Sequence, residues 1–158
     1  MKYCHQSTIS HPLAIAYPGF LENINLIFQV EGGNGVPFNH EVALNLDKIK
    51  DNSGNTDIKH MRSMDMVIGM KENNNIFSLL VDFKLRCNNP VNISEGECRD
   101  KIKHSKRLLF GSGISVHNRY VFIFNDDLLN VSRRVLSMRL ANAFADALSI
   151  DDLKSIYF

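Results

Sequence analysis

The chain has 158 residues, of which 44% are hydrophobic and 22% are charged, which suits one globular domain with a buried core. We therefore expect a single domain over residues 1–158. The formal net charge of +1 does not by itself call for a nucleic acid, so any basic binding surface has to be local. No stretch has the length of a membrane span and no signal peptide is recognisable, so we expect a cytoplasmic protein without a membrane partner.

The three cysteines, Cys4, Cys87 and Cys98, are odd in number and are not spaced as in a zinc site. Disulfides are rare in the cytoplasm. We therefore expect three free thiols.

The first predicted element is a helix within 18–29, ahead of a glycine-rich breaker. Its apolar side chains lie near helical spacing, at Phe20, Ile24, Ile27 and Phe28. The next segment, 40–50, fits two patterns. Alternation at Val42, Leu44 and Leu46 favours a strand, whereas Val42, Leu46 and Ile49 also fit a helix, and we favour the strand.

Two strand-forming segments, 66–70 and 76–85, flank a short polar turn and predict a β-hairpin. If the turn centres on 73–74, antiparallel partners have residue numbers that sum to 147. Asp65 and Asp82 then face each other, with Cβ atoms about 4.5–5.5 Å apart. A three- or five-residue loop would instead shift the sum by one and place the two aspartates on opposite faces.

Side chains alternate along a strand, so Lys84 shares the face of Asp82. We expect the other face, with Val81 and Phe83, to be core and the first to carry the charges. Two opposed carboxylates repel each other unless a cation lies between them. The hairpin therefore predicts a divalent metal or a basic neighbour beside Asp65.

Three further elements follow the hairpin. A capping box at 94–97 and an apolar stripe predict a helix that ends at Gly111. Residues 119–125 read as a short buried strand. Residues 127–148 read as one long amphipathic helix, with a stripe at Leu129, Val135, Leu136, Leu140, Phe144 and Leu148.

The order helix, strand, hairpin, helix, strand, with Asp65 and the Asp82-Phe83-Lys84 tripeptide on the hairpin, resembles the restriction-endonuclease-like superfamily and its PD-(D/E)xK signature. The resemblance covers about residues 18–126, and Met64 stands where the signature has proline. It implies an α/β fold: a small mixed β-sheet flanked by helices, with an αβββαβ core, to which we add a C-terminal helix over about 127–148.

By this resemblance the catalytic residues are Asp65, Asp82 and Lys84, and the metal ligands are Asp65, Asp82 and an acid from the first helix. Glu22 is the first choice for that acid, with Glu31 and Glu41 as alternatives. Magnesium or manganese suits such oxygen ligands. The tripeptide alone is weak evidence, because Asp57-Ile-Lys59 and Asp152-Leu-Lys154 match it too and a strand-end ion pair is the plain alternative.

Six basic residues follow the hairpin and form the predicted nucleic-acid-binding set: Arg86, Arg99, Lys101, Lys103, Lys106 and Arg107. The plain alternative is a solvated helix face. We expect a metal-dependent phosphodiesterase or nuclease that acts on nucleic acid, and we favour DNA over RNA as its substrate. The rival hypothesis is a non-catalytic binding or immunity-type protein on the same fold. A homodimer or a protein partner is a further expectation.

Overall fold

A computed structural model describes residues 1–53 and 56–158. Its centre is a mixed sheet of seven strands in the order β2-β3-β4-β5-β6-β7, with β1 paired to β4 beside this path. The strands are β1 (Lys2–Tyr3), β2 (Leu21–Asn23), β3 (Val42–Asn45), β4 (Met66–Glu72), β5 (Asn75–Phe83), β6 (Ser115–Ile123) and β7 (Phe144–Leu148). Pairing is antiparallel from β2 to β5 and parallel from β5 to β7.

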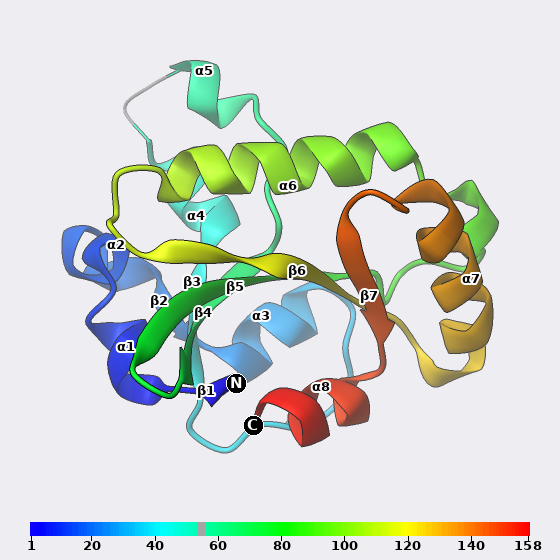
Figure 1. Ribbon diagram of the computed structural model, residues 1–158, viewed down its shortest axis with the longest axis horizontal. Coiled ribbons are helices and arrows are strands. Elements are labelled where there is room, and N and C mark those ends of the chain that lie inside the picture. The colour runs from blue at the N-terminus through cyan, green and yellow to red at the C-terminus, as the bar shows by residue number, and fades with distance from the viewer. Residues whose placement is uncertain (54–55) are drawn as a thin grey trace.

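Helices cover both faces of this sheet (Figure 1). The α-helices are α1 (His5–Ile9), α2 (Pro12–Ala16), α3 (Ile24–Val30), α4 (Leu46–Asp51), α5 (Thr56–Lys59), α6 (Glu95–Leu109), α7 (Leu129–Arg139) and α8 (Ile150–Tyr157). The 3-10 helices are η1 (Pro18–Phe20), η2 (Pro90–Asn92) and η3 (Asp126–Leu128). Within the described residues, no helix is both long and apolar enough to cross a membrane.

The molecule therefore has three layers, helix, sheet and helix, and two apolar cores. Helices α3 and α8 pack on one face of the sheet, over Ile68, Leu79 and Val81. Helices α4 and α6 pack on the other face, over Val67 and Leu80. The α/β class and the mixed sheet flanked by helices are as predicted.

The hairpin β4-β5 has the predicted register. Paired residues run from Met66 opposite Val81 to Glu72 opposite Asn75, so that every pair sums to 147. Asn73 has a φ of 53°, in the left-handed region that two-residue hairpin turns require and that asparagine tolerates. The turn chemistry alone thus fixed which side chains meet at the far end of the hairpin.

The expectation of one apolar and one charged face on this hairpin was wrong. Asp82 is fully buried and shares its face with Leu80, which packs beneath α6. A sheet covered by helices on both sides leaves no solvent-exposed face at its centre. The charges of the candidate site are therefore held inside the protein, at the end of the hairpin.

The first helix begins later than the sequence pattern indicates. Residues 21–23 form β2, an edge strand paired with β3, and Asn23 then caps α3 by accepting a hydrogen bond from the backbone N–H of Asn25 at 2.8 Å. Both interpretations of the next segment hold in part. The chain is the strand β3 as far as Asn45 and turns helical at Leu46.

The long helix predicted over 127–148 is the largest error. Helix α7 stops at Arg139, and residues 144–148 form β7, a parallel partner for β6. The C-terminal helix of the protein is α8 instead. As a strand, residues 144–148 pair their backbone with β6 and bury Ala147 and Leu148 on opposite faces of the sheet, one in each core.

The three cysteines are free, as predicted. Cys98 is on the buried side of α6, and burial raises the pKa of its thiol. Nothing about it indicates a nucleophile.

Candidate functional site

The candidate site lies where β4 begins and β5 ends, because the hairpin register brings two aspartates together there. Asp65 directly precedes β4, and its Oδ2 accepts a hydrogen bond from the backbone N–H of Phe83 at 2.5 Å. Asp82 stands on β5 beside it and is fully buried. The opposed pair that the sequence predicted is therefore present.

Two lysines neutralise Asp82. Lys84 Nζ lies 2.6 Å from Asp82 Oδ2, as an ion pair without hydrogen-bond geometry. Lys101 Nζ donates to Asp82 Oδ1 and also lies 3.2 Å from Asp65 Oδ1. The Lys101 ammonium thus bridges the two carboxylates, and it is the basic neighbour that their repulsion calls for.

Helix α6 delivers Lys101 to this position and is fixed to the segment that carries Asp65. The backbone N–H of Met64 donates to Ser105 Oγ at 2.8 Å, and both residues are fully buried. Arg62 pairs with Glu97, about two turns before Ser105 on the helix. The buried hydrogen bond between Met64 and Ser105 therefore joins the segment that carries Asp65 to the helix that carries Lys101.

Asp65 also belongs to an acidic triad with Glu31 and Asp47. One ligand oxygen from each of the three lies within 4.8 Å of the others. Oxygen ligands of an octahedral magnesium ion lie at most about 4.2 Å apart, twice the metal–oxygen distance, so a small closure would let the triad share one ion. The triad could therefore hold a divalent metal.

The other two acids of the triad come from helix ends. Asp47 lies in the first turn of α4, where the helix dipole favours an anion, and it accepts a hydrogen bond from Ser63 at 2.5 Å. Glu31 is the C-cap of α3, where the dipole disfavours an anion. A carboxylate in that unfavourable place gains from a nearby cation.

The pKa values of the acids reflect this crowding. Burial, followed by the neighbouring Asp82 charge, raises the pKa of Asp65 well above its usual range. Burial likewise raises the pKa of Glu31, with the charge of Asp47 adding to the effect. Burial alone would lower the pKa of Lys101, but Asp82 and Asp65 outweigh it and raise that pKa. The ammonium of Lys101 therefore stays charged at neutral pH.

Glu22, the first choice from the first helix, lies elsewhere. It is on β2, where its carboxylate pairs with Lys48 and accepts a hydrogen bond from Asn45 at 2.8 Å. Among the described residues the clustered acids are those of the triad, so of the alternatives from the first helix the structure places Glu31 at the site. Glu41 instead accepts a hydrogen bond from the backbone N–H of Asn39.

The predicted nucleic-acid-binding residues do not form one surface. An α-helix turns about 100° per residue, so residues two positions apart, such as Lys101 and Lys103, lie on opposite flanks. Lys101 faces the carboxylates, which corrects its prediction as a surface contact. Arg99, Lys103 and Lys106 line a groove on the other flank, beside Ile102 and Ala143.

The remaining two members lie apart from that groove. Arg86 follows β5, and its guanidinium donates to the carbonyl of Val30 at 2.5 Å, next to Glu31. Arg107 is exposed near the end of α6. Arg86 is exposed and lies two residues after Lys84. Its hydrogen bond to Val30 also brings it to the residue before Glu31.

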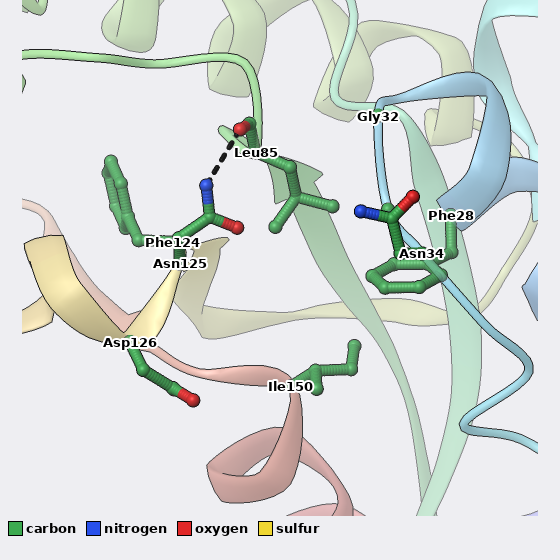
Figure 2. A pocket seen from close by; sticks show the side chains of 9 residues that line it. Phe28, Gly32, Asn34, Leu85, Phe124, Asn125, Asp126 and Ile150 are labelled. Atoms are coloured by element: carbon green, nitrogen blue, oxygen red, sulfur yellow. Dashed lines mark hydrogen bonds between the residues drawn. The ribbon is translucent and has the colours of Figure 1, made fainter.

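The structure also has a cavity of about 200 Å³ (Figure 2). None of the acids of the candidate site, nor Lys84 or Lys101, is among the residues that line it. It is lined by Phe28, Gly32, Gly33, Asn34, Leu85, Phe124, Asn125, Asp126 and Ile150. This lining contains no basic side chain in the described part of the chain and includes a carboxylate, so we do not place a phosphate there.

Comparison of the chain with protein-family models, curated proteins and solved structures gave no match. The functional argument therefore rests on the geometry of the site.

Proposed function

We propose that the protein is a metal-dependent phosphodiesterase that cuts nucleic acid, DNA in preference to RNA, with magnesium or manganese as its cofactor. One observation carries the proposal: Asp65, Asp82 and Lys84 converge at the end of a hairpin, beside the acidic triad. The order α3, β3, β4, β5, α6, β6, with β5 parallel to β6, agrees with the αβββαβ core that the resemblance implies and supports the same function.

The metal would be held by Glu31, Asp47 and Asp65, and when bound it would supply a polarised phosphate and a more acidic water. The reaction joins a water oxygen to phosphorus and breaks one P–O ester bond; the departing alcohol takes up a proton, and the water loses one. Lys84 is half-buried and its ammonium rests on Asp82, so it can orient the water or stabilise charge on the phosphate. In this proposal Arg86, two residues after Lys84, would contact the adjoining phosphate.

The test is cleavage of labelled single-stranded, duplex and branched DNA and of RNA, with magnesium or manganese and with a chelator. Asp65→Ala, Asp82→Ala and Lys84→Ala should each lower the rate by about a hundredfold or more. Lys59→Ala and Lys154→Ala are the matched controls, because these lysines complete the two other copies of the tripeptide and lie on α5 and α8. Loss of activity in a control would show that the hairpin is not the site.

A second measurement separates the metal ligands from the other acids. Manganese should raise the melting temperature of the native protein, because an ion that binds only the folded state stabilises it. Glu31→Ala and Asp47→Ala should remove most of this rise, whereas Glu22→Ala should keep it. An equal rise in all three variants would place the ion elsewhere.

The contacts of Lys101 favour a second candidate function, a non-catalytic binding module. Its ammonium already neutralises both Asp65 and Asp82, so the pair is stable without any metal. If no substrate is cut under any metal condition and manganese leaves the melting temperature unchanged, the enzyme proposal fails and the binding module replaces it.

A further inference from the structure

The position of Lys101 suggests a role that neither a surface lysine nor a simple ion pair explains. We propose that its ammonium takes the place of a second metal ion, so that the native protein binds one divalent ion at this centre. A variant with a neutral side chain at position 101 would then bind two. This inference rests on the metal centre of the proposed function.

The first support is that Asp65 is shared between two groups of partners. Towards Glu31 and Asp47 it forms the triad, and towards Asp82 it meets Lys101. A carboxylate has about four lone-pair positions, so the hydrogen bonds that Asp65 accepts from Phe83 and Lys101 leave room for one more cation. Two-metal hydrolases place two cations about 3.5–4 Å apart. Here two cation positions share one carboxylate, and an ammonium fills one of them.

The second support is that Asp82 depends on Lys101. Asp82 is fully buried, and Lys84 reaches only its Oδ2. Without Lys101, Asp82 Oδ1 and Asp65 Oδ1 would face each other with no charge between them. Buried carboxylates in that arrangement bind a proton or a metal ion. A neutral side chain at position 101 therefore leaves a repulsive pair of carboxylates that can act as metal ligands.

The third support is that the ammonium is held in place. The Lys101 side chain is only 21% exposed, and its helix is anchored by the buried bond between Met64 and Ser105. An ion competing for this position must break two charge-assisted contacts at once, which disfavours it. The exchangeable ion is thus confined to the triad.

The experiment counts bound manganese per chain, from the loss of the free-ion signal in electron paramagnetic resonance. We expect one ion for the native protein and two for Lys101→Met, which has a similar length and no charge. Lys103→Met is the matched control, two residues along on the opposite flank, and should bind one. Lys101→Arg keeps the charge and should also bind one.

A double variant guards against misfolding of Lys101→Met. Lys101→Met/Asp82→Asn removes both the cation and one of the opposed anions, so it should fold without metal and bind one ion. If Lys101→Met alone requires manganese to regain its native circular dichroism, this also supports the inference, provided that the double variant has no such requirement.

Each of the other numbers of bound manganese ions contradicts the inference. One ion in both the native protein and Lys101→Met overturns the inference and leaves the proposed metal centre standing. Two ions in the native protein overturn it as well, since Lys101 then excludes nothing. No ion in either protein refutes the inference and the metal centre together.

Discussion

The two flanks of α6 carry the same kind of side chain and use it in opposite ways. On one flank Lys101 is half-buried and bonded to two carboxylates. On the other, Arg99, Lys103 and Lys106 line a groove, and Arg99 pairs with Glu95 one turn away and donates a hydrogen bond to the carbonyl of Arg139. Lys103 makes no hydrogen bond or ion pair with any residue that the structure describes.

The difference shows that a basic residue on a helix gains its role from what the opposite element offers. Lys101 faces Asp65 and Asp82, which the hairpin register brings together where β4 begins and β5 ends. The other flank faces Ala143 and the backbone carbonyl of Arg139, which carry no charge. Electrostatic contacts are strong on the buried flank and screened on the exposed one. Three measurements can break or sharpen this contrast.

The largest effect should be on stability. Lys101→Ala leaves buried carboxylates without their shared cation and should lower the free energy of unfolding by about 3 kcal/mol, the low end for a broken buried ion pair because Lys84 still neutralises Asp82. Lys103→Ala should change it by less than about 0.5 kcal/mol. Denaturant unfolding in the presence of a chelator measures both. Equal losses would mean that the two flanks do not differ.

The next effect is a pH dependence confined to the buried flank. The folded-state pKa values of Asp65 and Glu31 are raised, chiefly by burial, so their protonation stabilises the metal-free protein at low pH. This stability is lost as the pH rises through those pKa values. Metal binding needs the ionised carboxylates and so strengthens over the same range.

The rise in melting temperature caused by manganese should therefore be small near pH 5 and grow towards pH 7.5, as thermal unfolding across that range would measure. Asp65→Asn removes one of the two titrating groups and should flatten the dependence. A manganese effect that is the same at every pH would contradict the assignment of Asp65 and Glu31 as ligands.

The smallest effect should be on nucleic-acid binding by the exposed flank. Lys103→Ala and Lys106→Ala should each weaken binding of a labelled DNA oligonucleotide a few-fold and reduce the salt dependence of binding by about one unit of slope. Fluorescence anisotropy over a range of salt concentrations, with a chelator present, would measure this. Lys101→Ala should leave the slope unchanged, because its charge is already neutralised inside the protein. A lower slope for Lys101→Ala would return this residue to the predicted surface set.

The sequence predicts local features of this protein correctly and fails where an element depends on a distant part of the chain. Where a short turn sets the geometry, as at Asn73, the prediction of which residues meet was confirmed. Where an element depends on a partner far along the chain, it failed. Residues 144–148 carry a spacing that fits both a helix and a strand, and pairing with β6 chose the strand.

The candidate site divides in the same way. By itself the sequence determined that Asp65 and Asp82 oppose each other and that Lys84 lies beside Asp82, because strand alternation and a two-residue turn fix those relations locally. Only the tertiary structure decided that Glu31 joins them in place of Glu22, that Asp47 completes an acidic triad, and that Lys101 bridges the aspartates. Those three side chains come from separate helices, and no periodicity along a chain encodes the position of one helix over another, which long-range packing sets.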